Sequence, residues 1–261
     1  MPVICIANQK GGVGKTTTTA ALAQGLSEHN KRILLIDWDP QGSLTVSFGF
    51  NPDNINLTSY DVLRGVMFDT GKPPIQDAVL HTEFPAIDIV PSNIELSQAQ
   101  LDLVEVDSRE LMLKEMLKPA LQEYDYILVD CLPSLGLLTI NALAAADKVL
   151  IPLQADFLAM KGLELLLHTI IEVKGKLNNN LEILGILFTM TNPRTLHSRE
   201  VIDVTKRAFG SIIRVFDSTI PTSVRFKEAP AAGMSILTYA SGSDGAAAYR
   251  TFTEEVLNEK S

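Results

Sequence analysis

The sequence feature that most constrains this chain is a glycine-rich segment near its N-terminus, Lys10-Gly11-Gly12-Val13-Gly14-Lys15-Thr16-Thr17. An apolar run, Val3 to Ala7, precedes it, and apolar residues at helical spacing follow it. A strand, a glycine loop, Lys-Thr and a helix together form the context of a phosphate-binding loop. Glycines let several backbone N–H groups converge on phosphate oxygens, and the helix N-terminus adds partial positive charge. The segment therefore predicts a nucleoside triphosphate site.

Two side chains of this loop have chemical roles that follow from the pattern. Lys15 is expected to reach the terminal phosphates, and the Thr16 hydroxyl is expected to ligate Mg²⁺. The loop departs from the usual spacing because Gln9 stands where the first glycine is expected and a second lysine, Lys10, precedes the glycine pair. Two lysines held against one tight turn repel each other unless an anion lies between them. This arrangement favours a ligand-binding loop over a simple glycine turn.

Composition and cysteine usage exclude several classes of protein. The 261 residues are 46% hydrophobic and 20% charged, which is typical of a soluble globular protein. The two cysteines, Cys5 and Cys131, are too few for a disulfide framework or a metal site, and the four histidines show no ligand spacing. No secretory signal and no apolar run long enough to span a bilayer is visible. We therefore expect a cytoplasmic protein.

Apolar strands and helical segments alternate along the chain. Strands are predicted at 3–7, 32–37, 87–91, 126–130, 148–152 and 183–189 and before Ile220, and helices at 96–103, 110–121, 160–177, 199–209 and 245–258. Ser108 is a candidate N-cap for the second of these helices. The pattern predicts a single α/β domain over residues 1–261, with a mostly parallel twisted sheet flanked by helices on both faces. Residues 48–85 are expected to form a mixed insertion over the sheet edge.

Carboxylates follow two of the predicted strands. The segment Asp37-Trp38-Asp39-Pro40-Gln41 follows one strand, and Asp130-Cys131-Leu132-Pro133-Ser134-Leu135-Gly136 ends another. Ligands of open α/β sheets bind outside the carboxyl ends of the strands, so these segments are expected to lie beside the glycine loop. Magnesium and a positioned water molecule are what phosphoryl transfer to water requires. Beside a phosphate-binding loop, a functional role is favoured over simple loop capping.

These motifs resemble those of the ParA/MinD family of ATPases, in which the glycine loop carries the additional lysine. Similarity to the ParA and Soj branch extends from Val3 to about Val256 and includes the D-x-D-P-Q and D-x-P-P-S-L-G motifs. Three positions depart from the family pattern: Ser223 replaces a frequent asparagine, Leu132 replaces the first proline of P-P-S-L-G, and Trp38 replaces a smaller residue. Trp38 is expected to pack in the core.

The resemblance implies a role for each motif residue. Lys10, Lys15 and Asp39 would be catalytic, with Lys10 reaching the nucleotide of a partner subunit and Asp39 positioning the attacking water. Thr16 would bind Mg²⁺ directly and Asp130 through water. ATP itself would be held by Lys10, Gly11, Gly12, Val13, Gly14, Lys15, Thr16 and Thr17, and at the adenine by Pro221 and Ser223.

A basic segment lies within an otherwise acidic chain. The whole chain has a net charge of −9, yet residues 194–227 contain seven basic and three acidic residues. The resemblance implies that Arg194 and Arg225 bind DNA without sequence preference, and only in an ATP-bound dimer. Arg199, Lys206, Arg207 and Lys227 are weaker candidates. Phosphate contacts of this kind are independent of sequence and sensitive to salt. A solvated helix face is the alternative for each residue.

Three functional classes follow from these observations. The first is a partition or cargo-positioning ATPase, which would form an ATP-dependent homodimer on nucleoid DNA and be stimulated by a ParB-like protein or cargo adaptor. The second is a MinD-like membrane-positioning ATPase, which is disfavoured because the tail from Thr251 to Ser261 contains three glutamates and one lysine. The third is an iron-protein-like reductase or an amide-forming ligase. One cysteine near the switch loop is too few for a shared cluster.

Overall fold

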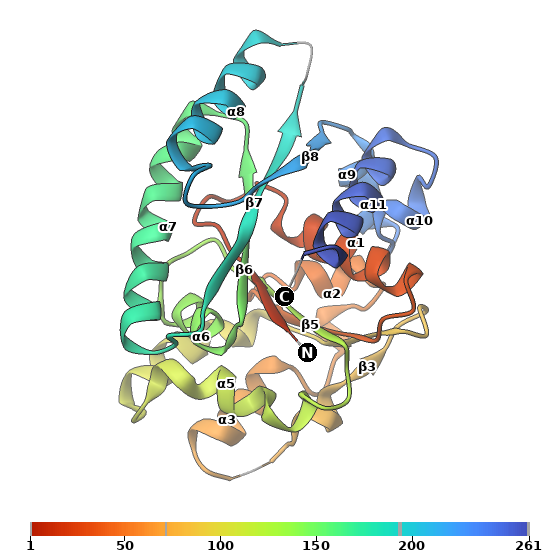
Figure 1. Ribbon diagram of the computed structural model, residues 1–261. Helices are drawn as coiled ribbons and strands as arrows, with labels where there is room; N and C mark the ends of the chain where they lie inside the picture. The colour runs from red at the N-terminus through yellow and green to blue at the C-terminus, as the bar shows by residue number, and fades with distance from the viewer. Residues whose placement is uncertain (1, 71, 193–194, 260–261) are drawn as a thin grey trace.

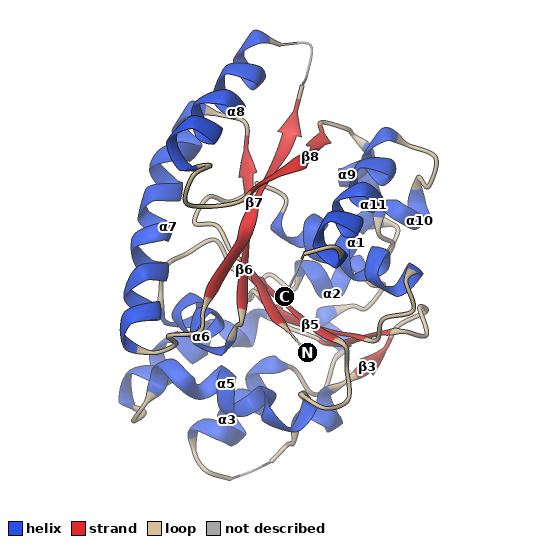
Figure 2. Ribbon diagram, in the orientation of Figure 1, coloured by secondary structure: helices blue, strands red, loops and turns tan. Residues whose placement is uncertain are grey.

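The computed structural model describes residues 2–70, 72–192 and 195–259, with the side chains of 157–159 omitted. Within these residues eight strands form one sheet in the order β3-β4-β2-β5-β1-β6-β7-β8, and helices cover both faces (Figures 1 and 2). Every neighbouring pair is parallel except β3 and β4, which are antiparallel. The predicted α/β fold with a mostly parallel sheet is confirmed.

The strands are β1 Val3–Ile6, β2 Ile33–Trp38, β3 Leu80–His81, β4 Ile87–Val90, β5 Tyr126–Cys131, β6 Lys148–Gln154, β7 Glu182–Thr191 and β8 Val215–Pro221. The α-helices are α1 Lys15–Glu28, α2 Ser43–Ser47, α3 Ser59–Met67, α4 Ala99–Asp102, α5 Met112–Leu117, α6 Leu137–Ala145, α7 Phe157–Lys176, α8 Leu196–Phe209, α9 Arg225–Ala231, α10 Ile236–Tyr239 and α11 Asp244–Leu257. The segment 48–85 contributes α3 and the edge strand β3.

Alternating side chains of the central strands supply two separate cores. In β1, Val3 and Cys5 join the core that packs beneath α3 to α8, whereas Ile4 and Ile6 join the core beneath α1, α10 and α11. The side chains of β2 alternate in the same way, and Leu34 belongs to the same core as Val3 and Cys5. Because both faces are buried, the strands are apolar throughout, which explains why they lack polar alternation in the sequence.

The two continuous helices predicted between β4 and β5 are in fact short α-helices interrupted by 3-10 turns. Residues 94–105 form two 3-10 turns around the four-residue α4, and residues 109–120 form 3-10 turns on either side of α5. Ser108 has a left-handed φ of 54° and its side chain caps no helix N–H, so the predicted N-cap is wrong. Helix α8 begins at Leu196, before the predicted start, because the Thr195 hydroxyl accepts a hydrogen bond from the Ser198 N–H.

Helix α1, which follows the glycine loop, is held tightly against α11 at Gly25. A Cβ atom at this position would lie 3.0 Å from Thr253 Cβ and 3.1 Å from its Cγ2, so rotation of the threonine cannot relieve the clash. We expect Gly25→Ala to lower the free energy of unfolding by about 2 to 3 kcal/mol. Gly175→Ala in α7 is the control, because a Cβ there meets nothing within 4 Å. It should stabilise the protein by about 0.5 to 1 kcal/mol in the same urea titration. Equal effects would refute the packing argument.

Candidate functional site

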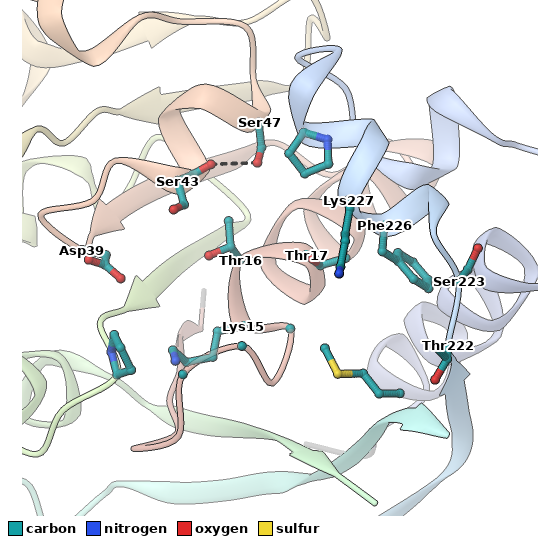
Figure 3. Close-up of a pocket in the computed structure, with 16 residues that line it drawn as sticks. Lys15, Thr16, Thr17, Asp39, Ser43, Ser47, Thr222, Ser223, Phe226 and Lys227 are labelled. Atoms are coloured by element: carbon teal, nitrogen blue, oxygen red, sulfur yellow. Dashed lines mark hydrogen bonds between the residues drawn. The ribbon is translucent and has the colours of Figure 1, made fainter. Parts of the chain in front are cut away.

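A cavity of about 620 Å³ lies at the carboxyl ends of the parallel strands, within the size range of ligand sites (Figure 3). Its lining comes from the loops after β1, β2, β5 and β8, from the end of β7, and from helices α1, α2 and α9. The lining residues are Gly11, Gly12, Gly14, Lys15, Thr16, Thr17, Asp39, Ser43, Ser47, Pro133, Met190, Thr222, Ser223, Phe226, Lys227 and Pro230. The structure therefore brings the glycine loop and Asp39 to one site.

The glycine loop has the backbone shape that its sequence predicts. Gly12 and Gly14 have φ values of 72° and 86°, in the left-handed region that favours glycine. Gly14 is also the N-cap of α1, where no side chain caps the helix. The Val13 carbonyl accepts a hydrogen bond of 2.8 Å from the Thr189 hydroxyl, which anchors the loop to β7. The first N–H groups of α1 consequently remain available for an anion.

Lys15 is a buried lysine at the start of α1. Its ammonium donates a 3.3 Å hydrogen bond to the Lys10 carbonyl within the same loop. Burial lowers the pKa of Lys15, and the nearby charge of Asp130 opposes that shift. A phosphate would provide the buried ammonium with a strong acceptor. The local structure therefore suits phosphate binding by Lys15.

The Lys10 side chain extends from the glycine loop toward Gln154 and Asp156 and not toward Lys15. Its ammonium donates to Gln154 Oε1 at 3.0 Å and forms an ion pair with Asp156 Oδ2 at 3.1 Å. The Lys10 side chain is 37% exposed, and Lys10 does not line the cavity. Lys10 thus lies beside its own subunit's phosphate loop but faces the surface, as a contact to a second subunit requires.

Asp130 lies at the end of β5, directly beneath the start of α1. The Thr16 hydroxyl donates to Asp130 Oδ2 at 2.7 Å, and the Thr19 hydroxyl donates to Oδ1 at 3.2 Å. Burial raises the pKa of Asp130, and the negative charge of Asp37 adds to the shift. Thr16 and Asp130 are therefore in contact, as the magnesium prediction requires. No group of three His, Cys, Asp or Glu side chains in the described ranges is placed to hold a metal, so a bound Mg²⁺ would need phosphates and water as ligands besides the Thr16 hydroxyl.

Asp37 is a buried carboxylate for which the sequence motifs predict no separate role. It is paired in register with Asp130 across β2 and β5. The Thr45 backbone N–H and hydroxyl both donate to Asp37 Oδ2, at 2.8 and 2.7 Å, and the Asp39 N–H donates to Oδ1. Burial raises the pKa of Asp37 to about 6. Asp37 therefore fixes the turn that carries Asp39.

Because the Thr45 hydroxyl donates to Asp37, we expect Thr45→Val to change the free energy of unfolding by an amount that depends on pH. Between pH 3.8 and about 6 the unfolded Asp37 loses its proton while the folded one keeps it, so the free energy of unfolding falls as pH rises through this window. Removing the Thr45 hydroxyl raises the folded pKa further and extends the loss above pH 6. We expect Thr45→Val to cost about 1 kcal/mol more at pH 8 than at pH 5 in urea denaturation. Thr45→Ser, which keeps the hydroxyl, should show no such difference; an equal cost of Thr45→Val at both pH values contradicts the account.

Asp39 lies at the opposite side of the cavity from the α9 residues (Figure 3). Its Oδ1 accepts a 3.0 Å hydrogen bond from the Gln41 N–H, which orients the carboxylate at the turn after β2. The side chain is only half-buried and is open to the cavity. A carboxylate in this position can orient or deprotonate a water molecule near the phosphates held by the loop.

The other end of the cavity is partly apolar. Phe226 and Ser223 of the α9 region lie together there (Figure 3), and Met190 and Thr222 also line the cavity. Met190 has a left-handed φ of 52°, which is strained for a residue with a side chain. Of the two residues predicted to contact adenine, Ser223 lines the cavity, whereas Pro221 ends β8 and is not a lining residue. Phe226 and Met190 had no motif that would have identified them.

The basic residues divide between two places. Arg199, Lys206 and Arg207 belong to α8, whereas Arg225 and Lys227 belong to α9 on the other side of β7 and β8 (Figure 1). Lys206 pairs with Asp217 at 3.5 Å. Arg194 lies outside the described residues. The described candidates therefore belong to two separate helices, and Lys227 lines the cavity although the residue is exposed.

Two of the three positions that depart from the motif pattern, Trp38 and Leu132, are buried. Trp38 is fully buried and its Nε1 donates a 2.9 Å hydrogen bond to the Leu138 carbonyl, as its expected packing role requires. Leu132 and Cys131 belong to the core beneath α3 to α8. A buried Cys131 is not available to an iron–sulfur cluster shared across a dimer. No described helix is sufficiently long and apolar to cross a membrane.

The sheet order, the glycine loop and the cavity at the strand ends define a P-loop NTPase. Consistent with this class, a family model described as an AAA domain matches residues 1–183. The chromosome partitioning protein ParA of Myxococcus xanthus is 43% identical over 98% of this chain and 87% of its own length. The sporulation initiation inhibitor protein Soj of Bacillus subtilis is 42% identical over 97% of both chains. The chain belongs to the ParA/MinD family of P-loop ATPases.

A solved structure of similar fold bears a different name. It is described as cobyrinic acid a,c-diamide synthase of Mycobacterium smegmatis with bound ADP and magnesium, and it is 36% identical. The similarity covers 98% of this chain and 94% of that one, with a TM-score of 0.85. A second structure of the same protein contains an ATP analogue and magnesium.

Proposed function

We propose that the chain is a partition or cargo-positioning ATPase that binds ATP and Mg²⁺ and hydrolyses ATP to ADP and phosphate. The observation that carries the proposal is the convergence of Lys15, Thr16 and Asp39 on one cavity above the buried Asp130. A magnesium-bound relative of the same fold supports the choice of cofactors. Relatives named for chromosome partitioning support the biological role.

Each site residue has a task in this reaction. The N–H groups of the glycine loop and Lys15 hold the terminal phosphates and offset their developing charge. Thr16 would provide a hydroxyl ligand for a magnesium ion, which would offset negative charge on the phosphates, and Asp130 would orient that hydroxyl or a magnesium-bound water. Asp39 orients the attacking water. Ser223 and Phe226 would hold the base.

The proposal includes an ATP-dependent homodimer. Lys10 supports this step because it lies on the phosphate loop, yet its side chain is exposed and turned away from its own cavity. For Lys10 to reach a nucleotide in a second subunit, its bonds to Gln154 and Asp156 would have to open. The nucleotide would then be part of the dimer interface, and hydrolysis would separate the subunits.

The ATP-bound dimer is proposed to bind nucleoid DNA without sequence preference. Arg225 is a described residue that supports this step, because it is exposed at the start of α9 and does not line the cavity. Two copies in a dimer would combine weak contacts into one stronger site. A ParB-like protein or cargo adaptor would stimulate hydrolysis and release the protein from DNA.

Charge reversal of Arg225 tests the DNA step. We expect Arg225→Glu to reduce ATP-dependent retention on random-sequence DNA at least tenfold, because phosphate contacts dominate such binding. Dimerisation with ATP, measured by light scattering, should persist. Lys176→Glu is the matched control, since Lys176 ends α7, which lies on the other side of β7 and β8 from α9 (Figure 1). Equal losses of DNA retention in the two variants would contradict the assignment, and joint loss of dimer and DNA binding would indicate a structural role.

The two alternative classes receive less support from the structure. A MinD-like membrane contact would need a free amphipathic helix at the C-terminus, but Tyr249, Phe252 and Val256 of α11 pack in the core against α1. An amide-forming ligase is favoured only by the name of the M. smegmatis structure. The relatives named for partition are more similar in sequence.

A further inference from the structure

Lys227 lines the cavity, whereas the other described basic residues of the segment 194–227 do not. Its side chain lines the same cavity as Thr17 and Ser223. Figure 3 shows its ammonium extending from α9 into the space between Thr17 and Phe226. Arg225, two residues earlier on the same helix, is absent from the lining. The two cations of α9 therefore have different surroundings.

The ammonium of Lys227 has no salt-bridge partner within residues 2–70, 72–192 and 195–259, and neither does Arg225. By contrast, Lys206 pairs with Asp217 and Arg214 pairs with Glu255. A lysine that projects into a cavity without a carboxylate partner is suited to an anionic ligand. The cavity already contains a phosphate-binding loop at one end.

The position of Lys227 along the cavity indicates which phosphate group of a nucleotide it would contact. The glycine loop and Lys15 lie at one end, where terminal phosphates bind, and Phe226 and Ser223 lie at the other, where a base would stack. A nucleotide that joins these ends must place its sugar and first phosphate between them. Thr17, which lies beside this middle region, belongs to the first turn of α1.

We propose that Lys227 is a nucleotide-binding residue that contacts the sugar-proximal phosphate of a nucleoside di- or triphosphate, and that it is not a DNA contact. This inference rests on the proposed function, because it assumes that the cavity holds such a nucleotide.

The test compares Lys227→Met, which keeps the apolar stem, with Lys174→Met near the distant end of α7 as control. We expect the dissociation constants of ADP and ATP to rise together by about three- to tenfold in Lys227→Met, because both nucleotides contain the same first phosphate. Added salt should weaken ADP binding less in the variant than in the wild type. Lys174→Met should match the wild type in both measurements.

A DNA-retention measurement distinguishes a nucleotide contact from a DNA contact at Lys227. At saturating ATP, Lys227→Met should be retained on random-sequence DNA as well as the wild type. Unchanged ADP affinity with lost DNA retention would make Lys227 a DNA contact and overturn the inference, as would no effect in either assay or weaker binding of ATP alone. If the wild type itself fails to bind DNA, the proposed function fails, whereas the ADP titration still tests Lys227.

Discussion

Lys15→Ala is expected to weaken the binding of ATP and ADP at least about 100-fold and to abolish hydrolysis. The Lys15 ammonium is buried beneath the glycine loop and donates a hydrogen bond to the Lys10 carbonyl. A phosphate would pair with this buried charge, and removing one partner of a buried charge pair costs about 3 to 5 kcal/mol. Titration with a fluorescent ADP analogue measures the loss directly.

Lys10→Ala is the matched control for this variant. Lys10 belongs to the same loop but points away from the cavity toward Gln154 and Asp156. Its removal should leave ADP binding by the monomer within about twofold and abolish the ATP-dependent dimer. If Lys10→Ala weakened ADP binding as strongly as Lys15→Ala, the different roles of the two lysines would be refuted.

Asp39→Ala is expected to lower the rate of ATP hydrolysis by about 100-fold or more while ATP still binds. A positioned acid or base contributes about 10² to 10⁴ to the rate of a proton transfer. Asp39 lines the cavity but lies across it from Lys227, and its removal takes a negative charge away from the phosphates. The variant should therefore accumulate as an ATP-bound dimer on DNA.

Phosphate release and light scattering, followed in parallel, measure this outcome. Gln41→Ala is the control, because the Gln41 backbone N–H, and not its side chain, donates to Asp39. It should hydrolyse ATP at close to the wild-type rate. Undiminished turnover in Asp39→Ala would remove Asp39 from the mechanism.

The sequence predicted those parts of the site that are local in the chain. The glycine loop is one continuous segment, so its conformation follows from Gly12, Gly14 and the adjoining strand and helix. Asp39 and Asp130 were predicted to lie near this loop because the carboxyl ends of parallel strands share one edge of the sheet. The contact between Thr16 and Asp130 follows from that topology.

The remaining features depend on packing between distant segments. Phe226 and Met190 meet at the cavity only because β7 and β8 are neighbours in the sheet and α9 follows β8. The direction of Lys227 is likewise a property of α9, so its charge alone placed it among the DNA candidates. The broken helices between β4 and β5 show the same limit, because apolar residues at helical spacing do not distinguish a continuous helix from successive short turns.

The most direct test of the central claim is the binding of Asp39→Ala to fluorescent random-sequence DNA, with ATP or ADP present and with the mass of the complex determined by light scattering. The account predicts binding with ATP only, as a dimer, weakened steeply by added salt and lost on adding the Arg225→Glu change. Equal binding with ADP and ATP, or binding by a monomer, would contradict the account.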